Sequence, residues 1–212
     1  MRISDKVILV DCDGVLMDWR YGFASYMYEE YGFEMVNHEQ ADYDISIMYP
    51  DFSKSTVYEY IEVFNTTEAM KSLPPHKDAI YYVRKLHEEH GYVFHMITAQ
   101  NTLGQNDQYF DNQVHLAREW RKENTRNLFG ETAFEKFHFT HNGDKTEFLE
   151  RYENTGCIWI EDHLDNAELG LNLGLDALLM DHTYNRNNRE GIEPFVPVMK
   201  NWKEIYHYIV GE

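Results

Sequence analysis

The chain has 212 residues, which suits one domain or a core with a small insertion. Acidic residues outnumber basic ones 37 to 19, and the formal net charge of −18 makes a long nucleic acid an unlikely partner, because such binding depends on Lys and Arg replacing counterions. The chain has two cysteines, no apolar run long enough to cross a membrane and no signal-peptide pattern at the N-terminus. We therefore expect a soluble cytoplasmic protein without membrane partners.

Short apolar runs that alternate with helical spacing predict the fold class. Val7–Val10, Tyr92–Ile97 and Cys157–Ile160 have the composition of strands buried on both faces, and Phe137–Thr140 and Ala177–Met180 are shorter runs of the same kind. We therefore predict an α/β fold with a Rossmann-like, mainly parallel sheet flanked by helices. The segments with helical spacing are 78–86, 110–120, 145–152, 167–173 and 202–209.

One region departs from this alternation. Between Asp18 and Ser72 no buried strand is evident, but helical spacing recurs, and Thr56–Glu59 has the spacing of a capping box. We predict a small helical cap at residues 19–72, inserted after the first strand, and a core made of residues 1–18 and 73–212. The residues with helical spacing in the cap are Trp19, Phe23, Tyr26, Met27, Val57, Tyr60, Ile61 and Phe64.

Acidic residues follow two of the predicted strands. Asp11 and Asp13 come after the first, and Asp162 comes after the strand that ends at Ile160. Parallel strands bring such residues to one edge of the sheet, where crowded carboxylates are costly unless they are paired or bind a cation. Oxygen-only ligands favour magnesium. We predict an Mg²⁺ site at Asp11, Asp13 and Asp162, with Glu161 and Asp165 as candidates to support it.

The same strand ends can support phosphoryl transfer. Asp11 would act as the nucleophile, and Asp13 would give a proton to the leaving oxygen and later take one from water. Thr98 would hydrogen-bond the phosphoryl group, and Lys145 would place a positive charge beside it. Gly14 would let backbone N–H groups approach the phosphate. Each residue also has a simpler interpretation, such as a turn aspartate or a surface lysine.

Four segments, in this order, resemble the motifs of the haloacid dehalogenase-like phosphatases. They are Asp11–Leu16, Ile97–Ala99, Gly143–Thr146 and Trp159–Asn166. The resemblance implies a magnesium-dependent phosphomonoester hydrolase that forms an aspartyl-phosphate, with Lys145 as an essential residue.

The place of the cap is similar to that in the 5′(3′)-deoxyribonucleotidases, and so are the segments Leu73–Pro75, Asp144–Thr146, His182–Arg186 and Asn201–Trp202. That resemblance implies a small phosphorylated partner, a nucleoside monophosphate, whose base would stack on aromatic side chains of the cap. The predicted substrate-binding residues are Gly14, Ala99, Trp19, Phe23 and Tyr26.

Two positions depart from the pattern of these nucleotidases. Ala99 stands where they carry Ser, so one phosphate contact is lost or replaced, and Glu161 stands where they carry Asp.

Three other functions stay open at this point. The chain could hydrolyse another small phosphate ester, such as a sugar phosphate, or a polynucleotide 3′-phosphate, which the acidic balance disfavours. It could also be a binding module with the same fold and no turnover. The proton donor predicted at Asp13 favours an enzyme, because a pure binder does not need one. An aromatic stripe such as Trp19, Phe23 and Tyr26 is more often part of a core than a surface that binds a ligand.

Overall fold

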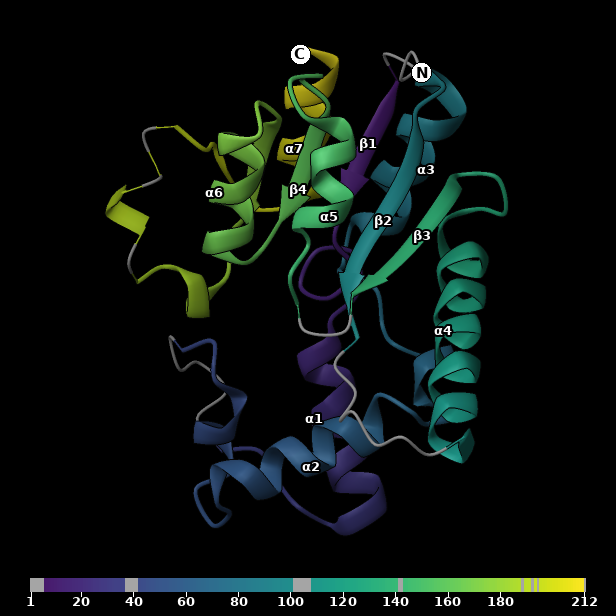
Figure 1. Cartoon of the computed structure of the whole chain (residues 1–212), viewed down its shortest axis with the longest axis vertical. Coiled ribbons are helices and arrows are strands. Elements are labelled where there is room, and N and C mark those ends of the chain that lie inside the picture. Colours follow the sequence, from purple (N-terminus) through teal and green to yellow (C-terminus); the bar gives the residue numbers. More distant parts are fainter. Residues whose placement is uncertain are drawn as a thin grey trace.

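The computed structural model describes residues 6–36, 42–100, 108–140, 143–187, 189–191, 193 and 195–211. Six strands form one parallel sheet in the order β3-β2-β1-β4-β5-β6, which confirms the predicted α/β fold class (Figure 1). The strands are β1 (Val7–Val10), β2 (Val93–Ala99), β3 (Phe134–Thr140), β4 (Ile158–Glu161), β5 (Asp176–Met180) and the two-residue β6 (Val198–Met199).

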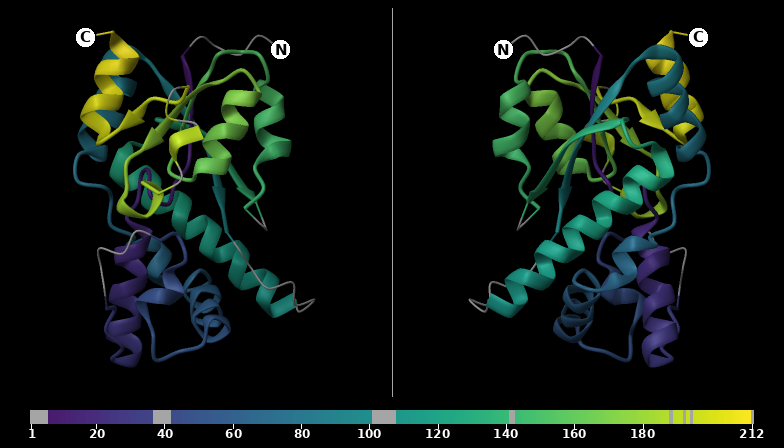
Figure 2. Two further views of the ribbon diagram at one scale, coloured as in Figure 1. Left: turned by 90° about the vertical axis from the view of Figure 1, so that its left-hand side faces the viewer. Right: turned by 90° about the vertical axis from the view of Figure 1, so that its right-hand side faces the viewer.

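Successive side chains of β1 point to opposite faces of the sheet, and both faces are covered. Ile8 and Val10 join one apolar cluster, whereas Val7 and Leu9 join the other. In Figure 2, α3 and α7 cover one face, and α5 and α6 cover the other. This is why the first strand is apolar at every position. The helices are α3 (Ala79–His90), α5 (Thr146–Leu149), α6 (Leu164–Asn172) and α7 (Trp202–Val210).

The predicted cap segment contains α1 (Trp19–Tyr31), the 3₁₀-helix η1 (Ile45–Met48), α2 (Lys54–Phe64) and the 3₁₀-helix η2 (Glu68–Lys71). These elements lie beyond the carboxyl ends of the strands (Figure 1). The capping box expected from Thr56 is wrong, because α2 begins earlier and the Ser53 hydroxyl accepts a hydrogen bond from the Thr56 N–H. The division into core and cap remains our proposal.

The two connections between the sheet and the cap run side by side. The N–H of Asp18 donates to the carbonyl of Pro74 at 2.8 Å, and the N–H of His76 donates to the carbonyl of Leu16 at 2.9 Å. Met17 forms a bridge with Pro75 between these bonds. The chain therefore leaves the core and returns to it at the same place.

Helix α4 (Gln108–Phe129) is much longer than its neighbours. It packs on β3 and extends to the level of the cap helices (Figure 2). Nearer its other end, Nη2 of Arg121 contacts Sδ of Met70 in η2 at 3.3 Å, and the Asn124 amide donates to the carbonyl of Leu73 at 3.0 Å. The helix thus contacts both the sheet and the segment we assign to the cap. Within the described part of the chain, no helix has the length and apolar character required to cross a membrane.

Candidate active site

Three buried carboxylates meet at the carboxyl edge of the sheet. Asp11 follows β1, and its N–H donates to the carbonyl of Ile160 in the neighbouring β4, at 3.0 Å. Glu161 is the last residue of β4 and Asp162 follows it. One carboxylate oxygen from each of Asp11, Glu161 and Asp162 lies within 4.8 Å of the other two. The adjacency of β1 and β4 therefore produces the acidic cluster.

Lys145 sits between two of these acids and is only 1% exposed. Its Nζ lies 3.0 Å from Oδ1 of Asp11 and 2.7 Å from Oε2 of Glu161. The other oxygen of Glu161 accepts the backbone N–H groups of Asp162 and His163. Both oxygens of Glu161 are thus engaged. Its side chain holds Lys145 and the β4–α6 turn in place, so Glu161 is a poor candidate for a direct metal ligand.

The charges in the cluster are poorly compensated. Burial raises the pKa of Asp11 to about 7 although Lys145 opposes the shift, and burial with the nearby Asp11 raises the pKa of Asp162 to about 6. Burial by itself would lower the pKa of Lys145, but Asp11 and Glu161 outweigh it and raise that pKa, so the ammonium stays charged. A divalent cation would relieve the repulsion between Asp11 and Asp162. The donor set therefore fits a hard cation.

Asp13 lies outside this cluster. Its Oδ2 accepts a hydrogen bond from Nη1 of Arg121 at 3.0 Å, and Arg121 is fully buried. Burial raises the pKa of Asp13, and Arg121 opposes that shift. The carboxylate of Asp13 as a metal ligand stays a prediction.

The sequence prediction missed Arg121, although a signal was present. Val114, Ala117 and Arg121 share helical spacing, so a charged residue stood on the buried face of the helix. Helical periodicity identifies such a residue but not its partner, which lies more than a hundred positions away along the chain.

The other predicted phosphate contacts lie at the same edge. The Oγ1 of Thr98, near the end of β2, is buried and has no hydrogen-bond partner among the described residues. Gly14 has a φ of 77°, and a Cβ there would lie 2.2 Å from Oδ2 of Asp162. Only glycine lets the loop approach this carboxylate so closely. A buried hydroxyl without a protein partner suits a hydrogen bond to an oxyanion.

A cavity of about 420 Å³ opens beside Gly14 and Asp162, lined by residues of the core and of the predicted cap. Tyr184 bounds it and donates from its hydroxyl to Oδ2 of Asp162 at 2.6 Å. The Arg20 guanidinium stacks on the Tyr184 ring, 4.0 Å from its centroid, and donates to the carbonyls of Asp42 and Tyr43. No pattern in the sequence pointed to Arg20 or Tyr43. The other residues that line the 420 Å³ cavity include Asp13, Gly14, Trp19, Met35, Ile45, Met48, Tyr58, Ile61, Ala99, Asp162 and His182.

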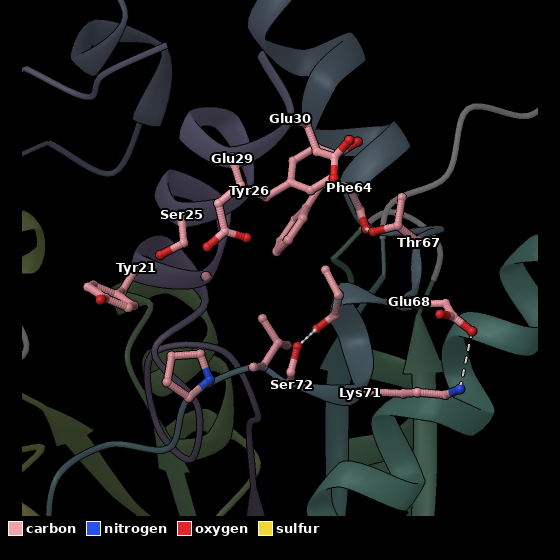
Figure 3. A pocket seen from close by; sticks show the side chains of 14 residues that line it. Tyr21, Ser25, Tyr26, Glu29, Glu30, Phe64, Thr67, Glu68, Lys71 and Ser72 are labelled. Atoms are coloured by element: carbon pink, nitrogen blue, oxygen red, sulfur yellow. Dashed lines mark hydrogen bonds and ion pairs between the residues drawn. The ribbon is translucent and has the colours of Figure 1, made fainter. Parts of the chain in front are cut away.

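The three aromatic residues predicted for the substrate site are not all at this cavity. Trp19 lines it, whereas Phe23 is fully buried and stacks on Trp19 with ring centroids 5.3 Å apart. Tyr26 lines a different cavity of about 650 Å³, which Figure 3 shows with Glu29 and Glu30 around it. Phe23 and Tyr26 therefore do not line the cavity beside Asp162, and their contact with substrate stays a prediction.

No protein-family model matches the sequence, and the search of curated proteins finds no similar protein. Solved structures do match. A haloacid dehalogenase-like hydrolase from Streptococcus pneumoniae aligns over 96% of this chain and 98% of its own, with a TM-score of 0.62 and 14% identity. The chain has the haloacid dehalogenase-like fold.

Two further structures with this fold are similar. A haloacid dehalogenase family hydrolase from Deinococcus radiodurans R1, with bound phosphate and sodium, covers 97% of this chain and 95% of its own at a TM-score of 0.56 and 18% identity. The D,D-heptose 1,7-bisphosphate phosphatase from Burkholderia thailandensis aligns over 98% of this chain and 100% of its own. Its TM-score is 0.53 and its sequence identity is 12%. The resemblance that the four sequence motifs suggested is thereby confirmed at the level of the fold.

Proposed function

We propose that this protein is a magnesium-dependent phosphomonoester hydrolase that acts on a nucleoside monophosphate. The observation that carries the proposal is the buried contact of Asp11 with Lys145, next to Asp162 and at the carboxyl edge of a haloacid dehalogenase-like sheet. Lys145 contacts one oxygen of Asp11, and the second oxygen lies outside this contact. That second oxygen is suited to attack a phosphorus atom while the lysine supplies positive charge. Similar structures named as hydrolases and phosphatases support the reaction class.

The proposed reaction has two steps. In the first, an oxygen of Asp11 bonds to phosphorus while the bond to the leaving oxygen breaks, and Asp13 gives that oxygen a proton. In the second, water attacks the aspartyl-phosphate, Asp13 takes the proton, and phosphate leaves as Asp11 is restored. Lys145 and the Thr98 hydroxyl contribute charge and a hydrogen bond to the phosphoryl oxygens.

The proposed metal-holding residues are Asp11 and Asp162, with Asp13 as the third predicted member. Mg²⁺ bound there would supply positive charge that offsets the charge of the substrate phosphate.

The raised pKa values of Asp11 and Asp162 predict how Mg²⁺ binding depends on pH. An acid whose pKa is raised on folding favours its protonated form, so the metal-free protein loses stability as pH rises from about 4 through 6 to 7. Mg²⁺ competes with these protons and binds better above pH 7. We expect saturating Mg²⁺ to raise the melting temperature by about 5–10 °C at pH 8 and by little at pH 5.

Thermal denaturation with Mg²⁺, or with NaCl at matched ionic strength, measures this difference. In Asp162→Asn the gain at pH 8 should largely disappear. An equal gain at both pH values would contradict the assignment of these carboxylates as ligands.

The lining of the 420 Å³ cavity favours a substrate with a flat apolar part. Trp19, Tyr58 and Ile61 contribute aromatic and aliphatic surface, and base–aromatic stacking is worth about 1–3 kcal/mol. A sugar phosphate is the second candidate, since one structure with the same fold is named as a phosphatase of a heptose bisphosphate.

A substrate panel tests the proposal. Nucleoside monophosphates, sugar phosphates and glycerol phosphate are assayed for phosphate release with Mg²⁺ and with EDTA. We expect a nucleoside monophosphate to give the highest kcat/KM and EDTA to stop release. Higher kcat/KM for a sugar phosphate than for every nucleotide would reject the nucleotidase part alone, and no release from any compound would reject the enzyme.

Tyr58→Ala links the substrate preference to the cavity. The substitution should raise KM for the nucleotide by roughly tenfold, because a stacking surface is lost, and should leave KM for glycerol phosphate nearly unchanged. Tyr81→Ala is the matched control, since Tyr81 is 62% exposed and lies outside this cavity.

A further inference from the structure

A short turn after β5 holds Asp162 at two points. The 3₁₀-helix η4 (Thr183–Asn185) places two consecutive side chains against this residue. The Tyr184 hydroxyl donates to Oδ2 of Asp162 at 2.6 Å, and Nδ2 of Asn185 donates to the backbone carbonyl of Asp162 at 2.7 Å. The carboxylate and the backbone of one buried acid are therefore fixed by the same turn.

The turn is itself braced by buried side chains. Oδ1 of Asn185 accepts the N–H of His182 at 3.0 Å and contacts Nη2 of Arg189. Arg189 is buried, and its Nη2 lies 2.6 Å from Oδ1 of Asp181. Tilting η4 would break this contact with a buried guanidinium, which is costly. Tyr184 therefore reaches its partner from a fixed direction.

Three other groups surround the Tyr184 side chain. The His182 ring stacks on the Tyr184 ring with centroids 4.8 Å apart and planes 8° apart, and the Arg20 guanidinium lies 4.0 Å from the Tyr184 centroid. A Cβ at Gly14 would lie 2.7 Å from the Tyr184 hydroxyl, so glycine leaves the space that this hydroxyl occupies. Arg20 belongs to α1 in the predicted cap, so the tyrosine connects the predicted cap with the acidic cluster.

We propose that Tyr184 is a positioning residue that orients the Asp162 carboxylate toward Mg²⁺, and that Arg20 supports it by holding the tyrosine ring. The inference rests on the proposed phosphatase function and deepens it, because it concerns how a proposed metal-holding residue is presented to the cation. A hydrogen bond to a metal-binding carboxylate fixes its direction, and loss of such a bond typically weakens metal affinity by about 10–100-fold. Tyr184 acts through Asp162 and needs no contact of its own with the metal or the substrate.

Calorimetric titration of the substrate-free protein with MgCl₂ tests the role of Tyr184. Tyr184→Phe keeps the ring and removes the hydroxyl, so the Kd for Mg²⁺ should rise by about tenfold. Tyr208→Phe is the matched control, since it removes a 2.8 Å hydrogen bond to Oδ1 of Asp176, outside the acidic cluster, and should leave the Kd unchanged. A Kd in Tyr184→Phe equal to that of the wild type would overturn the proposal, and so would absence of Mg²⁺ binding by the wild type.

A double-mutant cycle tests the part assigned to Arg20. Arg20→Gln should raise the Kd for Mg²⁺ by about threefold more in the wild type than in Tyr184→Phe, because its effect passes through the tyrosine hydroxyl. Any effect of the arginine charge at a distance is common to both backgrounds and cancels in this comparison. Equal changes in the two backgrounds would overturn the part assigned to Arg20.

Phosphate release separates positioning from general structural damage. Excess Mg²⁺ should restore kcat of Tyr184→Phe to within about twofold of the wild type, because the metal still binds once its concentration exceeds the raised Kd. A kcat that stays low at saturating Mg²⁺ would overturn the positioning role. A wild-type protein that binds Mg²⁺ but hydrolyses no phosphomonoester would reject the proposed function alone, while the comparison of Kd values still decides on Tyr184.

Discussion

Replacing Asp11 by Asn is expected to abolish phosphate release, with kcat lower by about 10⁴-fold or more, because the amide cannot act as the nucleophile. Folding should survive. Burial already raises the pKa of Asp11 to about 7, so a neutral side chain is tolerated there, and Lys145 keeps its 2.7 Å contact with Glu161. The measurements are steady-state phosphate release and the melting temperature of the same preparation.

Asp51→Asn is the matched control for this prediction. Asp51 is exposed, lies in the predicted cap and is not a member of the acidic cluster, so its variant should turn over at the wild-type rate. Wild-type turnover in Asp11→Asn would mean that another residue attacks phosphorus. Loss of folding in that variant would mean that Asp11 is needed for structure in its ionised form.

Replacing Lys145 by Met is expected to have the largest effect on stability. The substitution removes the one cation in contact with Asp11 and Glu161 among the described residues, so buried carboxylates lose their compensation. Breaking a buried pair in this way costs about 3–5 kcal/mol. Turnover should fall as well, because the phosphoryl oxygens lose a positive charge. Chemical denaturation at two pH values measures the stability change.

The pH comparison identifies the cause. Without Lys145 the pKa values of both carboxyl groups rise further, so protonation at pH 5 removes much of the repulsion that persists at pH 8. The free-energy loss in Lys145→Met should therefore be clearly larger at pH 8. An equal loss at both values would indicate that packing of the lysine stem, and not its charge, stabilises this region. Lys77→Met, at an exposed position, should change stability by less than about 0.5 kcal/mol.

The residues of the acidic cluster could be predicted because strand ends are visible in the sequence. Asp11 and Asp162 each follow an apolar run, and parallel strands bring such positions to one edge of the sheet. Hydrophobic periodicity could not show that β1 lies between β2 and β4, but the shared edge did not depend on that order. The acidic cluster could therefore be predicted from the sequence. The hydrogen bonds that engage both oxygens of Glu161 could not, because they depend on where Lys145 lies in the fold.

Contacts between elements that are far apart in the chain could not be predicted from the sequence. Arg121 meets Asp13 across the interface of α4 with the loop after β1, and Arg20 stacks on Tyr184 from the opposite end of the chain. Spacing places a residue on a helix face but does not say what lies opposite. The same limit explains the cap, where helical spacing made Phe23 and Tyr26 equal candidates. Packing then buried the former and turned the latter toward another cavity.

The paired connections at Leu16–Asp18 and Pro74–His76 bear on how freely the predicted cap could be exchanged. Because the two segments are hydrogen-bonded neighbours, the ends of the intervening stretch are already held together by the core. A stretch of different length or sequence can be exchanged at that point with little added entropy of loop closure. The carboxylates of the acidic cluster lie outside it and would keep their arrangement. The predicted cap could thus change while the acidic cluster, which we propose for the chemistry, keeps its place at the edge of the sheet.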